Sequence, residues 1–236
     1  IHHAMQLKFT RSFSRNLMFL NSYTWGKTQD LVSDTESSTL NAYDHRMDWG
    51  LAAFDLRHNF TSSWTWALPF GKGQRWLNTG PALVRGLAGG WEISGIALLR
   101  SGLPFTVTQQ QGVLSTGTGN RPDRIASGKL ENPSIDRWFD TSAFRPTADN
   151  TGTYGNAGKN ILTAPGQAQF DFNIAKNTRI NERFRHQFRL ELFNAFNRPQ
   201  FAGPGSTIGT ASAGVISSLL FNTPMRQIQM AMKLFF

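Results

Sequence analysis

The side chains able to do chemistry are scattered along this chain and lack the spacing of a common site. Residues 26–28, Gly-Lys-Thr, match the end of a phosphate-binding loop, but Asn21 stands where the first glycine of that loop belongs. His2 and His3 are adjacent and His45 lies apart from them. A histidine pair without a third ligand at a known spacing is more often a surface feature than a metal centre. We therefore expect neither a nucleotide site nor a metal site.

Acidic side chains gather between residues 28 and 48, a polar stretch that we expect to be a long loop. They are Asp30, Asp34, Glu36, Asp44 and Asp48. Carboxylates can coordinate calcium, but this spacing is not that of a calcium loop, so we expect these side chains to be solvated. The chain has no Gly-x-Ser-x-Gly turn, and no carboxylate pair has a companion that would assign acid and base roles. The sequence thus predicts no enzyme and no cofactor.

Composition excludes several classes of protein. The 236 residues are 39% hydrophobic, and no run approaches the roughly 18 consecutive apolar residues of a membrane helix. The absence of cysteine excludes disulfides and thiolate metal sites. Lys and Arg give a net charge of +9 but are scattered singly, which does not fit a nucleic-acid-binding surface. These cations suit a barrel lumen, anionic lipid headgroups or a solvated surface.

The stretch 225–236 organises the fold prediction, because its residues alternate between an apolar and a polar set. The apolar set is Ile228, Met230, Met232 and Leu234, ahead of a terminal Phe236, and the other set is Gln227, Gln229, Ala231 and Lys233. This period predicts a strand that is apolar on one side only, as expected between lipid and a wet lumen. The last strand of a soluble sandwich would show the same period.

Six further stretches alternate in the same way. The predicted strands cover residues 4–13, 16–27, 51–68, 91–108, 167–180, 185–197 and 225–236, with a helical turn at 81–87. The connections near residue 14, at 69–90 and near residue 181 are shorter, and those at 28–48, 109–166 and 197–224 are long. In an antiparallel up-and-down meander all long loops then share one end of the sheet. We therefore predict an all-β outer-membrane barrel with its long loops extracellular and its C-terminus periplasmic.

Charged residues on the polar sides of these strands would point into the lumen, where they can be hydrated. They are Asp55, Arg57, Asp171, Arg189 and Glu191. Lipid would impose a cost of about 2–4 kcal/mol on a cation at the midplane. If the fifth and sixth strands form a tight hairpin, Asp171 and Arg189 should be near neighbours across it.

Four segments in a fixed order resemble the C-terminal part of TonB-dependent outer-membrane receptors, particularly the Oar-type group of soil bacteria whose members carry a carboxypeptidase-regulatory-like domain. The segments are residues 55–60 running to 68–73, residues 89–95 running to 101–105, residues 120–123 with 138–139 and 143–144, and residues 189–201. A terminal Phe236 follows them, and together they span nearly the whole chain.

The resemblance implies a 22-stranded barrel plugged by an N-terminal domain, in which energised contact with TonB lets a bound substrate pass. Seven strands would be the final third of such a barrel, and neither the plug nor the TonB-contacting segment is in this chain. The set Ile228, Met230, Met232, Leu234 and Phe236 looks like the signal read by the barrel-assembly machinery, and it is equally the lipid face of the last strand. The chain begins at Ile1 without an initiator methionine or signal peptide, so we expect a fragment of a longer protein.

The resemblance also implies uptake of a bulky nutrient such as a siderophore complex or an oligosaccharide. Its contacts would lie on the lumen face and in the 109–166 loop, for which we nominate Arg121, Asp123, Trp138 and Phe139. Trp138 and Phe139 could stack on a sugar or could pack the loop on itself. Two rival functions stay open at this point: an adhesion or surface-assembly barrel that transports nothing, and a soluble β-sandwich binding module whose apolar faces are buried.

Overall fold

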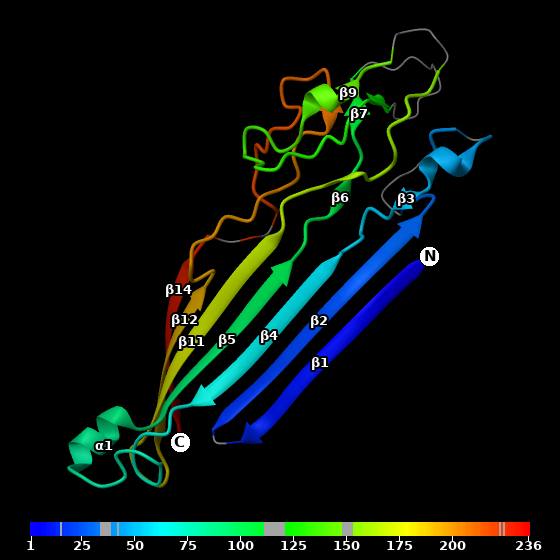
Figure 1. Ribbon diagram of the computed structural model, residues 1–236. Coiled ribbons are helices and arrows are strands. Elements are labelled where there is room, and N and C mark those ends of the chain that lie inside the picture. The colour runs from blue at the N-terminus through cyan, green and yellow to red at the C-terminus, as the bar shows by residue number, and fades with distance from the viewer. Residues whose placement is uncertain are drawn as a thin grey trace.

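The computed structural model describes residues 1–14, 16–33, 39–41, 43–110, 121–147, 153–221, 223 and 225–236. Within these ranges, long antiparallel strands form one main sheet in the order β1-β2-β4-β5-β11-β12-β14 (Figure 1). Their bounds are β1 His2–Ser14, β2 Leu17–Asp30, β4 His58–Ala67, β5 Trp91–Arg100, β11 Gln167–Arg179, β12 Arg185–Phe193 and β14 Gln227–Phe235. A short β3, Gly50–Leu51, pairs with the end of β2. The prediction of an all-β antiparallel fold is confirmed.

The register brings the apolar sides of all these strands onto one face of the sheet. One row of directly paired residues across six strands reads Phe19, Trp64, Gly95, Phe172, Leu192 and Ile228. The next row reads Met18, Thr65, Ser94, Asn173, Glu191 and Gln229. Because successive side chains point to opposite sides of a strand, the two rows belong to opposite faces. We call them the apolar face and the polar face.

Gly95 shows how tightly the aromatic side chains of the apolar face pack. It pairs with Trp64 on β4 and with Phe172 on β11. The two rings lie 6.3 Å apart between centroids, and a Cβ atom on Gly95 would lie 2.9 Å from the Trp64 ring. Glycine is therefore required here by the ring surface laid over it.

Two strands are shorter than their sequence pattern predicts, and a third, predicted to cover 185–197, ends at Phe193. The prediction of 51–68 is wrong in extent, because only β3 and β4 are strand within it. The prediction of 91–108 is wrong beyond Arg100. The chain turns at Gly102, where a Cβ atom would lie 1.7 Å from the Ala164 carbonyl oxygen, and Pro104 then has no N–H for the ladder. Alternation continues past both strand ends, but the backbone leaves the sheet.

The three longest connections lie at one end of the sheet and the three shorter ones at the other (Figure 1). The long ones join β2 to β4, β5 to β11 and β12 to β14. The β4–β5 connection contains α1, Ala82–Ala88, at the site of the predicted helical turn. In the described ranges, no helix combines the length and the apolar character needed to cross a membrane.

The long connections fold into a compact body that we call the loop unit. Its short strand pairs are β6 (Pro104–Phe105) with β10 (Leu162–Thr163), β7 (Thr108–Gln109) with β13 (Thr207–Ile208), and β8 (Asp123–Arg124) with β9 (Phe144–Arg145). Two 3-10 helices, η1 His45–Asp48 and η2 Thr141–Ala143, lie in the same connections. A buried cluster holds it together: Val107, Phe139, Ala143, Phe144, Ala157, Leu162 and Ile208. The apolar core among the described residues thus lies in the loops, while the apolar face of the sheet stays uncovered.

The main sheet is open. Among the described strands, β1 pairs only with β2, and β14 pairs only with β12. Both edges therefore present backbone groups without a strand partner, and no closed barrel is seen.

Candidate functional site

A shallow hollow of about 330 Å³ lies at the centre of the sheet. Its polar-face lining is Met18, Ser63, Thr65, Ser94, Ile96, Asp171, Asn173, Glu191 and Phe193. Hydroxyl, amide and carboxylate groups from the four strands β4, β5, β11 and β12 therefore converge there. The Asn173 amide nitrogen donates a hydrogen bond to Ser94 Oγ at 3.1 Å, whereas its Oδ1 is buried and has no partner among the described residues. Such a surface can exchange hydrogen bonds with a hydroxyl-rich ligand.

The two carboxylates at this hollow already have protein partners. Asp171 accepts hydrogen bonds from the Gln169 amide at 3.1 Å and from the Asn194 backbone N–H at 2.8 Å. Glu191 forms an ion pair with Arg189 at 3.2 Å. Both side chains are therefore held in place before any ligand arrives.

The expectation that Asp171 and Arg189 are near neighbours is wrong. Arg189 pairs with Ala175, which lies four residues from Asp171 along β11. That offset corresponds to about 13 Å along the strand. The register centres the β11–β12 turn near residue 182, whereas a direct Asp171–Arg189 pair requires a turn centred at residue 180. A shift of two residues at a hairpin turn moves every cross-strand pair by four.

Asp55 and Arg57 lie just before β4, at the long-loop end of the sheet. The Asp55 carboxylate accepts a hydrogen bond from the Thr28 backbone N–H at 2.5 Å and forms an ion pair with Arg57 at 3.3 Å. Asp55 is buried. These contacts hold the chain entering β4 against the end of β2.

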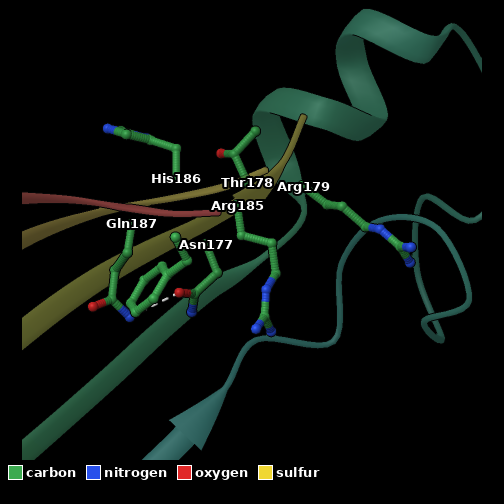
Figure 2. A pocket seen from close by; sticks show the side chains of 7 residues that line it. Asn177, Thr178, Arg179, Arg185, His186 and Gln187 are labelled. Carbon is green, nitrogen blue, oxygen red and sulfur yellow. Dashed lines mark hydrogen bonds between the residues drawn. The ribbon is translucent and has the colours of Figure 1, made fainter. Parts of the chain in front are cut away.

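A second hollow, of about 320 Å³, lies at the short-turn end of β11 and β12 (Figure 2). Its lining residues are Asn177, Thr178, Arg179, Arg185, His186, Gln187 and Phe235. The Gln187 amide donates a hydrogen bond to Asn177 Oδ1 at 2.8 Å, and the Arg185 guanidinium lies 5.9 Å from the Phe235 ring centroid. Two guanidinium groups beside amides form a surface suited to a carboxylate or phosphate.

Two of the loop residues nominated as substrate contacts connect parts of the chain instead. Arg121 is buried, pairs with Asp48 and donates a hydrogen bond to the Met47 carbonyl oxygen at 2.5 Å. Asp123 accepts a hydrogen bond from the Asn156 backbone N–H at 3.0 Å. Within the loop unit, these bonds join the β5–β11 connection to η1 and to itself.

A further ion pair between distant segments was not predicted from the sequence. The Lys159 ammonium forms an ion pair with Asp30 at 2.8 Å and donates a hydrogen bond to the Leu31 carbonyl oxygen at 3.1 Å. No motif marks Lys159, because its partner lies 129 residues away in the chain. The acids Asp30 and Asp48 therefore serve as partners of buried cations instead of being solvated.

The nominated aromatic residues pack the loop on itself. Phe139 is 1% exposed, and its ring lies 5.7 Å from that of Phe105 and 5.9 Å from that of Phe144 between centroids. The Trp138 indole is half-buried and donates a hydrogen bond to the Thr163 carbonyl oxygen at 2.8 Å. Stacking on a ligand requires an exposed ring face, and Phe139 has none.

The acidic residues of the described loops also show no metal centre. Asp44 accepts a hydrogen bond from the Arg46 backbone N–H at 3.0 Å and thereby caps η1. Asp34 and Glu36 lie outside the described residues. Within the residues that the structure describes, no group of three or more His, Cys, Asp or Glu side chains could hold a metal ion.

Comparison with protein families decides the class. A family model described as an outer membrane beta barrel domain matches residues 1–229. This chain belongs to that family. No curated protein and no solved structure matches the chain. The outer-membrane location follows.

The apolar face of the barrel domain is suited to lipid from β2 to β14, because the row from Phe19 to Ile228 carries no charged side chain; on β1 the same row ends at Arg11. On β14, Ile228, Met230, Met232 and Leu234 lie on this face and are exposed, and Phe236 follows the strand. Asp171, Arg189 and Glu191 lie on the polar face. Their position inside a closed lumen, and the reading of the β14 residues by the assembly machinery, stay predictions.

We predict that the hydrogen bonds around the Asp140 carboxylate in the loop unit depend on pH. Hydrogen bonds from the Ser142 hydroxyl and from Arg137 hold the pKa of Asp140 below its ordinary value of 3.8. A lowered pKa stabilises the folded state above the ordinary value, and this contribution is lost as pH falls through the lower, folded value. We expect the protection of the Ser142 amide against hydrogen exchange, measured relative to an unfolded peptide at the same pH, to fall on acidification below about pH 4. In Asp140→Asn this pH dependence should disappear, and an identical profile in both proteins would contradict the assignment.

Proposed function

We propose that the barrel domain is the C-terminal part of a TonB-dependent receptor that imports a bulky nutrient, such as a siderophore complex or an oligosaccharide. The observation that carries the proposal is the folded loop unit, which lies at one end of a sheet that has one apolar face and one polar face. A loop unit with its own buried cluster presents a preformed surface, and preorganisation lowers the entropic cost of binding. The ordered motifs shared with these receptors support the same function.

The polar face supplies the groups that such a nutrient needs. The central hollow offers hydroxyls and amides from Ser63, Thr65, Ser94 and Asn173, which can bind sugar hydroxyls. At the short-turn end, Arg179 and Arg185 can bind acidic groups. A ligand moving from the loop unit along this face would meet hydrogen-bonding groups first and cationic groups later.

The open edges of the sheet support a larger barrel. An exposed strand edge is not tolerated in the hydrocarbon region, since lipid offers no hydrogen-bond partner. β1 and β14 therefore need further strands, which we propose to belong to a 22-stranded barrel together with a plug and a TonB-contacting segment outside this chain. We further propose that the barrel-assembly machinery reads Ile228, Met230, Met232, Leu234 and Phe236.

The test is uptake by cells that express the full-length gene or carry a deletion of it. The probes are a radiolabelled ferric hydroxamate siderophore and a fluorescent malto-oligosaccharide, each measured with and without a protonophore. We expect uptake of one probe to require both the gene and the proton gradient. Uptake that requires the gene but not the gradient would show a passive channel and overturn TonB dependence. Gene-independent uptake of both probes would overturn the import proposal.

A further inference from the structure

The connection between β4 and β5, residues 68–90, carries an apolar helix surface that no other described residue covers. No residue of α1 is buried. Leu83 is 74% exposed and Leu87 is 66% exposed, with Val84 beside them. Residues i, i+1 and i+4 lie on one side of an α-helix, so these three side chains form a single apolar stripe. Single exposed apolar residues are ordinary, but a complete stripe on one helix indicates a contact surface.

The helix is clamped to the sheet by its C-terminal end. The Lys176 ammonium donates hydrogen bonds to the carbonyl oxygens of Gly86 at 2.6 Å and Leu87 at 3.1 Å, and to that of Gly89. The Trp91 indole N–H also donates to the Leu87 carbonyl oxygen, at 2.9 Å. A cation at the free carbonyl groups of a helix C-terminus satisfies them and complements the helix dipole. The orientation of α1 is therefore set by side chains of β5 and β11.

The clamp lies at the border of the apolar face. Lys176 pairs directly with Trp91 across β5 and β11, two residues beyond Ile174 on the same face. The Lys176 ammonium is 5.3 Å from the Trp91 ring centroid. Amphipathic Trp and Lys side chains are characteristic of the boundary between hydrocarbon and headgroups. The helix α1 lies at the short-turn end of the sheet, next to this boundary (Figure 1).

The charge of the connection indicates which surface it contacts. Residues 68–90 contain Lys72, Arg75 and Arg85 and no acidic residue. Trp76 is exposed next to Arg75, whose guanidinium lies 5.5 Å from its ring centroid. Cations flanking an apolar stripe with an interfacial Trp suit a leaflet that contains anionic phospholipid.

We propose that residues 68–90 form an interfacial anchor, in which α1 lies in the headgroup layer at the short-turn end and inserts Leu83, Val84 and Leu87 among the acyl chains. Anionic headgroups would be bound by Lys72 and Arg75. This inference rests on the outer-membrane family of the chain and on the clamp geometry, and it holds whether or not the protein transports a ligand.

The test uses the full-length protein, free of other cysteines, reconstituted in vesicles. A fluorescent label is attached to Leu83→Cys or, as the matched control on the other side of α1, to Ala82→Cys; both positions are exposed, so neither label should disturb folding. We expect lipids brominated in the acyl chain to quench the label at position 83 more than that at position 82, and aqueous iodide to do the reverse. Equal quenching at both positions would overturn the anchor.

The lipid composition tests the charge component. The same two proteins are compared in phosphatidylcholine vesicles and in vesicles that also contain phosphatidylglycerol. We expect the contrast between positions 83 and 82 to increase with phosphatidylglycerol and to decrease again at high salt, because salt screens the attraction. A contrast that is independent of phosphatidylglycerol would overturn recognition of anionic headgroups.

Discussion

Replacing Ile174 with arginine should sharply reduce the amount of assembled protein in the outer membrane. Ile174 lies near the middle of β11 on the apolar face, paired with Ile93 and Leu190. An arginine on the lipid side near the bilayer midplane costs about 2–4 kcal/mol. The same substitution at Asn173, the adjacent residue on the polar face, should have little effect, because Asn173 lines the central hollow and an arginine there can be hydrated.

The measurement is the fraction of full-length protein that resists unfolding by detergent at room temperature in outer-membrane preparations. We expect Ile174→Arg to lose most of this fraction and Asn173→Arg to retain it. The two variants lie one residue apart and introduce the same side chain, so the added charge and volume of the arginine are matched. Equal loss in both variants would contradict the assignment of the two faces, and the reverse order would mean that the polar side meets lipid.

Replacing Phe139 with alanine should unfold the loop unit while leaving the strands in place. Phe139 is the largest fully buried side chain among the described residues and contacts the rings of Phe105 and Phe144. Truncating a buried phenylalanine costs about 3–5 kcal/mol in lost burial and cavity formation. The cluster around it is small, so this loss is a large share of what holds the loop unit together.

Hydrogen exchange resolved by peptide measures this effect. We expect Phe139→Ala to speed exchange in residues 121–147 and 157–165, with β4, β5 and β11 unchanged. The control is Phe221→Ala, which removes the same side chain from a position that is 87% exposed in another long connection. Unchanged exchange in Phe139→Ala, or equal acceleration in the control, would show that the cluster does not stabilise the loop unit.

Much of the sheet could be predicted from alternation alone, since a strand with one apolar side needs no knowledge of its partners. The pattern of Phe170, Phe172 and Ile174 predicts the strand and its faces correctly. The ends of strands were harder to predict, because Phe105 and Val107 continue the alternation of β5 although the chain has already turned at Gly102. The same period therefore describes both a sheet strand and a loop segment that enters a separate cluster.

The sequence by itself determined which residues share a face, where the long loops lie and that the chain belongs with outer-membrane barrels. These follow from local periods and connection lengths, which are properties of neighbouring residues. Only the tertiary structure decided that Arg189 lies opposite Ala175, that Phe139 is buried in the loop unit, and that Lys176 clamps α1. Each of these depends on a turn position or on a partner many residues away. Contacts between residues that are distant in the sequence form only when the whole chain folds, so local patterns do not reveal them.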